Sequence, residues 1–166
     1  MRQNCKIIII NGPPGVGKST TAKLIAQYSQ NSVCIQGDDI KHWIVNRNSE
    51  NLTKGLTYIN GGACCRNYLK AGYELIIFDY VFTKKIHVER FIENCEMRES
   101  YFLFTLIAPL SIIKQREQLR LNRKPLGKAV DIAYAEIIKN KTDLGTFINT
   151  ELLSPQEVCK IIHKFL

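Results

Sequence analysis

The sequence has no long hydrophobic run and no cysteine spacing that suits a metal. Its uninterrupted apolar stretches, such as Ile7–Ile10, are far shorter than the roughly 20 residues that cross a bilayer, or the about 7–15 of a signal-peptide core. The six cysteines form no CxxC pair and no spacing with histidine that is typical of zinc sites. We therefore expect a soluble, cytoplasmic protein with reduced cysteines and no membrane partner.

Signals of disorder and of several domains are also missing. The chain has 166 residues, of which 45% are hydrophobic and 23% charged, close to globular averages. It contains no repeat, low-complexity segment or linker. We therefore expect residues 1–166 to form a single domain.

Acidic residues are scarce relative to basic ones. The 23 lysines and arginines exceed the 15 acidic residues by eight, which favours anionic or phosphorylated partners. The excess is concentrated between Lys114 and Lys128, where six basic residues accompany Glu117 as the one acidic residue.

Short β-branched runs alternate with longer segments of helical period, which is typical of a parallel sheet with crossover helices. Strands are predicted at Lys6–Ile10, Ser32–Gln36, Glu74–Asp79, Tyr101–Ala108 and Thr146–Asn149. The first four are continuous apolar runs, as expected of strands covered on both faces. Helices are predicted at Lys18–Tyr28, Asp39–Val45, Tyr58–Lys70, Lys84–Asn94, Leu110–Asn122, Val130–Lys139 and Pro155–Phe165, the last after a capping box at Ser154–Glu157.

Residues Gly12–Ser19 match the phosphate-binding pattern GxxxxGK[ST], between a predicted strand and a predicted helix. Glycines in such a loop allow backbone N–H groups to approach phosphate oxygens, and the helix start adds its positive dipole end. Lys18 would bridge the β- and γ-phosphates, and the Ser19 hydroxyl would bind Mg²⁺. The alternative is a glycine-rich turn with a surface lysine.

Aspartates stand where two predicted strands end. The carboxyl ends of parallel strands line the ligand crevice of an open sheet. Asp38 there can accept a proton from an acceptor hydroxyl, whereas Asp39 can cap the following helix or act as a supporting ligand. Which of the two is the base stays open. Asp79 is expected on the Mg²⁺ side, or else in a structural hydrogen bond.

The basic cluster has helical spacing, which places Arg116, Arg120, Arg123 and Lys124 on one predicted helix face. Pro125–Gly127 would then interrupt the helix. This combination favours a mobile lid at about residues 114–128 that closes on a triphosphate, and a solvated basic face is the alternative.

Together these segments resemble the small P-loop kinases, a group that contains chloramphenicol phosphotransferase, gluconate kinase and zeta-toxin-type enzymes. The residues that carry the resemblance are Gly12–Ser19, Gly37–Lys41, Asp79, Ala108–Leu110 with Arg116 and Arg120, and Phe147–Thr150. The resemblance implies an α/β three-layer fold, with a five-stranded parallel sheet in the order 2-3-1-4-5 between helices.

The resemblance also implies ATP and Mg²⁺ as cofactors and assigns the site residues. Lys18, Asp38 and Arg120 would be catalytic, and Ser19 and Asp79 would face the metal. Nucleotide binding would involve Gly12, Pro13, Pro14, Gly15, Val16, Gly17, Lys18, Ser19, Thr20, Arg116, Asn149 and Thr150. The choice of ATP over GTP rests on this resemblance.

The implied function is transfer of the γ-phosphoryl group of ATP to a hydroxyl of a small metabolite, antibiotic or nucleoside-type acceptor. The acceptor would bind between the second and third strands, where the residues match no acceptor signature: Lys41, His42, Trp43, Arg47 and Tyr58. The alternative is a nucleotide-binding regulatory or RNA-associated protein. The basic cluster favours it, but that cluster has no aromatic residue on which bases could stack.

Residues Asn140–Asp143 spell NKxD, the guanine-reading pattern of GTPases. The preceding residues keep helical rather than strand period, and the chain contains no DxxG for a γ-phosphate switch. We therefore expect a helix end and a loop at this position.

Overall fold

Five strands form one parallel sheet at the centre of the molecule. The computed structural model describes residues 6–46, 55–96, 101–120 and 124–165. The strands are β1 (Lys6–Asn11), β2 (Ser32–Gln36), β3 (Leu75–Asp79), β4 (Tyr101–Ile107) and β5 (Thr146–Asn149). Their order is β2-β3-β1-β4-β5 and every pairing is parallel, so the predicted topology is confirmed.

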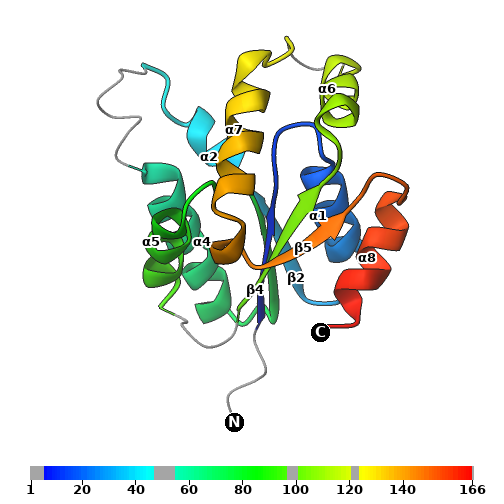
Figure 1. The fold of residues 1–166 in the computed structure, drawn as a ribbon. Coiled ribbons are helices and arrows are strands. Elements are labelled where there is room, and N and C mark those ends of the chain that lie inside the picture. Colours follow the sequence, from blue (N-terminus) through cyan, green and yellow to red (C-terminus); the bar gives the residue numbers. More distant parts are fainter. Residues whose placement is uncertain (1–5, 47–54, 97–100, 121–123, 166) are drawn as a thin grey trace.

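Helices cover both faces of this sheet (Figure 1). They are α1 (Lys18–Gln27), α2 (Gly37–His42), α4 (Leu56–Lys70), α5 (Lys85–Cys95), α6 (Leu110–Gln118), α7 (Lys128–Lys139) and α8 (Pro155–His163), with a short 3-10 helix at Lys141–Asp143. Helices α1 and α8 lie against one face, and α4 and α5 against the other. Helices α2 and α6 and the start of α7 rise above the carboxyl ends of the strands.

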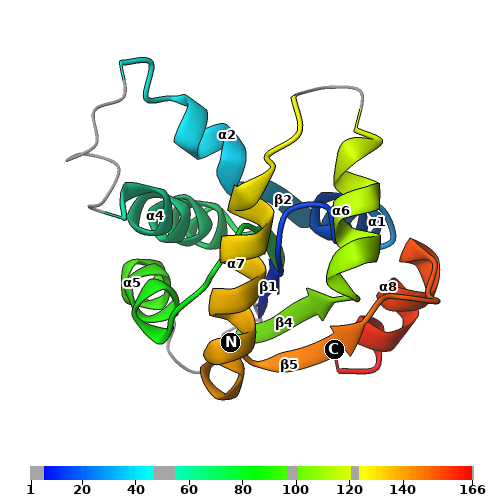
Figure 2. The same cartoon turned by 45° about the horizontal axis from the view of Figure 1, so that its top comes forward.

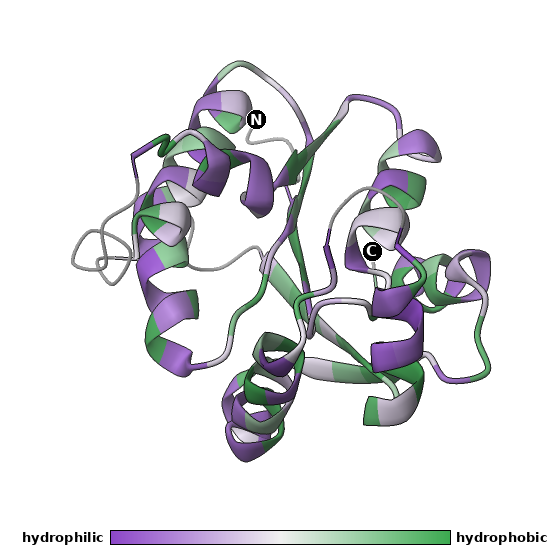
Figure 3. Ribbon diagram, turned by 90° about the horizontal axis from the view of Figure 1, so that it is seen from above, coloured by the Kyte–Doolittle hydropathy of each residue, from purple (hydrophilic) through white to green (hydrophobic). Residues whose placement is uncertain are grey.

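The four isoleucines of β1 explain why a continuous apolar run forms a central strand. Ile8 and Ile10 pack in the cluster that includes α1 and α8, and Ile7 and Ile9 pack in the cluster that includes α4 and α5. All four are fully buried. Viewed from above, hydrophobic strands lie between helices that carry hydrophilic residues (Figure 3). Strand β2 differs from the expectation, because it is an edge strand and half-buried throughout.

Two glycines bring α4 close to its neighbours. A Cβ atom on Gly61 would lie 2.5 Å from the Phe78 ring of β3, and one on Gly62 would collide with the Phe91 carbonyl of α5. The glycines therefore allow the close packing of α4, although glycine weakens a helix interior.

Two predicted helix boundaries are wrong in ways that concern the site. Helix α2 begins at Gly37 rather than Asp39, with Gln36 at its N-cap. Helix α6 ends at Gln118 rather than Asn122, where the Arg120 N–H donates to the Glu117 carbonyl in a tighter i→i−3 bond of 3.3 Å. Arg120 therefore lies outside the helix, and the predicted helix face that it shares with Arg116 does not exist.

Two other local predictions are confirmed, one at the start of α8 and one at the end of α7. The capping box of α8 is present, with the Ser154 hydroxyl accepting from Glu157 N and the Glu157 carboxylate accepting from Ser154 N. Asn140 ends α7, and the next three residues form the 3-10 helix, so NKxD follows a helix as expected. The five described cysteines are unbridged. No helix in the described segments is long and apolar enough to span a membrane.

Candidate active site

The phosphate loop, Gly12–Ser19, connects β1 to α1 and requires glycine at several positions. Gly12, Gly15 and Gly17 have φ angles of 141°, 89° and 104°. Residues with a Cβ atom strongly disfavour such positive φ angles. A Cβ atom on Gly12 would also collide with the Leu106 carbonyl of β4, and one on Gly15 would lie 2.7 Å from the Ile113 carbonyl of α6. The loop is therefore packed tightly between the sheet and α6.

The start of α1 offers donors to an anion. Helix α1 begins at Lys18, and no described side chain caps it. Its first backbone N–H groups and its positive dipole end can therefore serve a phosphate. The Lys18 ammonium donates to the Pro13 carbonyl at 3.1 Å, which places it over the loop.

Half-buried Ser19 and buried Asp79 form a hydrogen-bonded pair at the start of α1. The Ser19 hydroxyl donates to Asp79 Oδ1 at 3.1 Å, and Asp79 is 4% exposed. The other carboxylate oxygen, Oδ2, is buried without a hydrogen-bond partner among the described residues. Burial raises the pKa of Asp79 to about 6, although Lys18 and Ser19 oppose the shift. A hydroxyl beside an orphaned carboxylate oxygen fits Mg²⁺, which prefers oxygen ligands.

Asp38 and Asp39 lie in the first turn of α2, at the carboxyl end of β2. Gln36 pairs with Asp79 across β2 and β3, so the two strands end side by side. Both aspartates are exposed. Gln36 donates to Asp39 Oδ2 at 3.4 Å. Because Gln36 holds the N-cap position, the predicted capping role of Asp39 is wrong, whereas the choice of base stays open.

The loop between β3 and α5, residues 80–84, is held by side chains from three other elements. Asn11 Oδ1 accepts from the Phe82 N–H at 2.7 Å, the Tyr58 hydroxyl donates to the Val81 carbonyl at 3.0 Å, and Asn140 Nδ2 donates to the Thr83 carbonyl at 3.0 Å. Sequence analysis missed the roles of Asn11 and Asn140. A polar residue at the end of the apolar β1 run was the available signal for Asn11.

Aromatic rings form one wall beside this loop. Tyr58 stacks on His87 with ring centroids 4.6 Å apart, and its hydroxyl lies 3.2 Å from His87 Nδ1. Burial raises the pKa of Tyr58. Burial, Lys84 and Arg90 lower the pKa of His87. Both rings are therefore neutral at pH 7, and this wall offers a polar, uncharged surface.

Arg116 ties α6 to the segment after β5. Its guanidinium donates to the carbonyls of Thr150 and Glu151 at 3.1 and 3.2 Å. Thr150 in turn donates its backbone N–H to the Ile107 carbonyl at 2.7 Å. Asn149 Oδ1 accepts from the Glu151 N–H at 3.0 Å. The structure therefore brings together Arg116, Asn149 and Thr150, the three residues expected near the nucleotide base.

Arg120, the expected lid arginine, is paired with Glu117. Its guanidinium lies 3.8 Å from the Glu117 carboxylate, and the two side chains are 40% and 2% exposed. Sequence analysis did not assign Glu117 a role. Lys114 donates to Asp131 at 3.0 Å, which links α6 to α7 at the base of the expected lid. Arg123 of the lid and Arg47 of the acceptor region lie outside the described residues.

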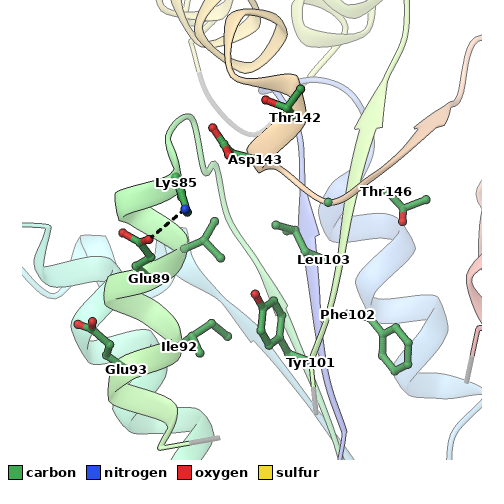
Figure 4. Close-up of a pocket in the computed structure, with 12 residues that line it drawn as sticks. Lys85, Glu89, Ile92, Glu93, Tyr101, Phe102, Leu103, Thr142, Asp143 and Thr146 are labelled. Atoms are coloured by element: carbon green, nitrogen blue, oxygen red, sulfur yellow. Dashed lines mark ion pairs between the residues drawn. The ribbon is translucent and has the colours of Figure 1, made fainter. Parts of the chain in front are cut away.

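A cavity of about 700 Å³ lies apart from the phosphate loop. It is bounded by α5, the start of β4 and the segment before β5, and Val88, Ile92 and Leu103 line it (Figure 4). Asp143 of the NKxD pattern lies at this cavity. The cavity contains no residue of the phosphate loop, so it is distinct from the candidate active site.

Comparison with known proteins supports the fold. The family model of the ATPases associated with various cellular activities (AAA) matches residues 8–79, which run from β1 through the phosphate loop to Asp79. No curated protein matches the chain in sequence.

Several solved structures, two of them of named kinases, match nearly the whole chain. The tunicamycin resistance protein of Deinococcus radiodurans is 20% identical, with a TM-score of 0.71 over 97% of this chain and 95% of that chain. A gluconokinase from Sinorhizobium meliloti is 15% identical, with a TM-score of 0.66 over 96% and 90%. A shikimate kinase from Acinetobacter baumannii in complex with shikimate is 16% identical, with a TM-score of 0.65 over 97% and 92%. The chain therefore has the P-loop fold of the small kinases.

Proposed function

We propose that the chain is a Mg²⁺-ATP-dependent phosphotransferase that acts on a hydroxyl of a small molecule, such as a metabolite, an antibiotic or a nucleoside-type acceptor. The observation that carries this proposal is the hydrogen bond from Ser19 to the buried Asp79 carboxylate, next to a glycine-rich phosphate loop. The gluconokinase and the shikimate kinase of the same fold support a small-molecule acceptor.

The nucleotide would bind along the phosphate loop. The backbone N–H groups of the loop and Lys18 would hold the β- and γ-phosphates. Ser19 and Asp79 would hold Mg²⁺, which neutralises charge on these phosphates when bound. Thr20, the next residue in the first turn of α1, belongs to the same proposed nucleotide-binding set. Arg116, Asn149 and Thr150 would shape the base side.

Transfer would follow an in-line displacement. The acceptor oxygen forms a bond to the γ-phosphorus, the bond from that phosphorus to the β–γ bridging oxygen breaks, and ADP leaves with the bond electrons. The acceptor proton passes to a carboxylate of α2, for which we propose Asp38, with Asp39 as the alternative. Arg120 would stabilise charge on the γ-phosphoryl oxygens.

The test is ADP formation from Mg²⁺-ATP with pooled metabolites, nucleosides and antibiotics, and Lys18→Ala as the blank. A pool that raises turnover well above the blank supports a kinase, and division of that pool identifies the acceptor. If wild-type protein binds ATP but no pool raises its turnover, a small-molecule kinase is contradicted for these acceptors. Salt-sensitive RNA binding that excess ATP does not reduce would then favour the RNA-associated alternative.

A further inference from the structure

Glu117 is a buried carboxylate that the proposed mechanism does not use. Within the described segments, the buried acidic side chains are Asp79 and Glu117. Asp79 is accounted for by Ser19 and the metal site. A buried carboxylate is unfavourable unless nearby groups compensate its charge. The burial of Glu117 therefore calls for a specific partner and a reason for its position.

Glu117 lies against the phosphate loop. A Cβ atom on Gly15 would lie 3.0 Å from the Glu117 Cβ and 2.7 Å from the carbonyl of Ile113, one turn earlier in α6. Figure 2 shows α6 beside the turn that connects β1 to α1. An unscreened negative charge at this position would repel a bound triphosphate.

Arg120 supplies a compensating positive charge. Its guanidinium lies 3.8 Å from the Glu117 carboxylate, and Arg120 forms no other ion pair with a described residue. Arg120 follows the end of α6, so the helix does not fix its backbone, although its N–H still donates to the Glu117 carbonyl at 3.3 Å. Glu117 therefore contacts Arg120 through both its backbone and its side chain.

We propose, resting on the phosphotransferase function above, that Glu117 is a positioning residue that holds Arg120 beside the phosphate loop before the nucleotide binds. A guanidinium has five N–H donors, so one edge can face the carboxylate while others bind γ-phosphoryl oxygens. Placed between the two anions, Arg120 screens Glu117 from the phosphates. Ordering the arginine in advance removes an entropic cost from the transition state.

The variants that test this proposal are Glu117→Gln, Arg120→Ala and the double variant. Glu117→Gln keeps the side-chain shape and removes its charge. We expect it to lower kcat about tenfold while the KM for ATP stays within about twofold, because the arginine acts mainly on transition-state charge. In the Arg120→Ala background the same change should not lower kcat further, and it should tighten ATP binding, because it removes a charge that no longer has its arginine. Glu93→Gln on the exposed side of α5 is the matched control and should behave as wild type.

A binding measurement keeps the test independent of the acceptor. Calorimetry compares Mg²⁺-ADP with and without aluminium fluoride, which mimics the planar phosphoryl group in transfer. Aluminium fluoride increases the affinity of the wild type for Mg²⁺-ADP, and we expect this increase to be about tenfold smaller in Glu117→Gln. A loss caused by Glu117→Gln that persists in the Arg120→Ala background would overturn the positioning role. If Glu117→Gln does not fold, Arg120→Lys, which loses the planar fork, should reproduce the tenfold loss, and wild-type affinity would overturn the proposal.

The two proposals fail in different ways. A wild type that gains affinity from aluminium fluoride, but transfers phosphate to no acceptor, contradicts the phosphotransferase function and leaves the Glu117 test valid. A wild type that binds no Mg²⁺-nucleotide contradicts both proposals. A wild type that transfers phosphate, with Glu117→Gln equally active, contradicts the role of Glu117 alone.

Discussion

The nucleotide side and the acceptor side of the candidate site are built differently. The proposed nucleotide side depends on backbone conformation and on the buried carboxylate of Asp79, which accepts from Ser19. The proposed acceptor side combines the exposed carboxylates of Asp38 and Asp39 on α2 with the stacked neutral rings of Tyr58 and His87 on other elements. In our proposal, phosphate recognition is therefore fixed by the fold, whereas acceptor recognition depends on exchangeable side chains. This difference agrees with a fold shared by proteins whose names denote different acceptors.

The largest expected effect is on the nucleotide side. Lys18→Ala removes the ammonium that lies over the phosphate loop and should lower turnover about 10³-fold, as measured by ADP formation. Lys160→Ala on the exposed side of α8 is the matched control and should keep full turnover. Normal turnover in Lys18→Ala would contradict a phosphate-binding role for the loop.

The acceptor side is tested by the two aspartates of α2. Replacing the base by asparagine, at Asp38 in our proposal, should lower turnover about 10²-fold and leave ATP binding unchanged, because general-base catalysis acts on the acceptor proton. The same change at Asp39 should have a small effect. A reversed result would make Asp39 the base, and two variants with normal turnover would exclude a base on α2. Steady-state kinetics and calorimetry of ATP give both readouts.

The buried carboxylate of the nucleotide side predicts a pH dependence of stability. Burial raises the pKa of Asp79 from 3.8 to about 6, so the folded protein holds this proton more tightly than the unfolded chain. Above pH 6 this group should therefore lower the free energy of unfolding by about 3 kcal/mol relative to pH below 4. Mg²⁺ should reduce that loss, because it binds the ionised carboxylate.

Urea unfolding of wild type and Asp79→Asn between pH 3.5 and 7.5, with and without Mg²⁺, measures this dependence. Asp79→Asn carries no titrating group at this position and should show a flatter profile that does not respond to Mg²⁺. Parallel profiles for the two proteins would contradict the raised pKa.

The smallest effects are expected at the loop between β3 and α5. Asn11→Ala leaves the buried Phe82 N–H without its acceptor and should lower the free energy of unfolding by about 1–3 kcal/mol. Asn140→Ala removes a half-buried hydrogen bond to the Thr83 carbonyl and should lower the free energy of unfolding by about 1 kcal/mol. Both should raise the KM for the acceptor more than the KM for ATP. An equal change in the two constants would argue against a link between this loop and the acceptor.

The fold and the nucleotide side could be predicted from sequence because their signals are local. The phosphate loop requires glycines within a few residues of each other, and the apolar run of β1 indicates burial on both faces. The capping box at Ser154 is likewise contained in four residues. Each of these features depends on neighbours in the chain, so the pattern and the structure agree.

The supporting residues could not be predicted because they meet only in the folded chain. Asn11, Tyr58 and Asn140 come from three distant elements and converge on one loop. Helical spacing placed Arg120 on a common face with Arg116, but α6 ends before it. The pairing of Arg120 with the buried Glu117 then depends on how α6 packs on Gly15, which no local pattern encodes.

The most direct test of the central claim follows the γ-phosphoryl group itself. Wild-type protein, Mg²⁺ and ATP labelled at the γ-phosphate are incubated with the acceptor pools, and the labelled products are separated. We predict label on a small-molecule hydroxyl, absent with Lys18→Ala and strongly reduced when the base of α2 is replaced by asparagine. Label that stays in ATP or appears only as inorganic phosphate, in a protein that binds Mg²⁺-ATP, would contradict a small-molecule phosphotransferase.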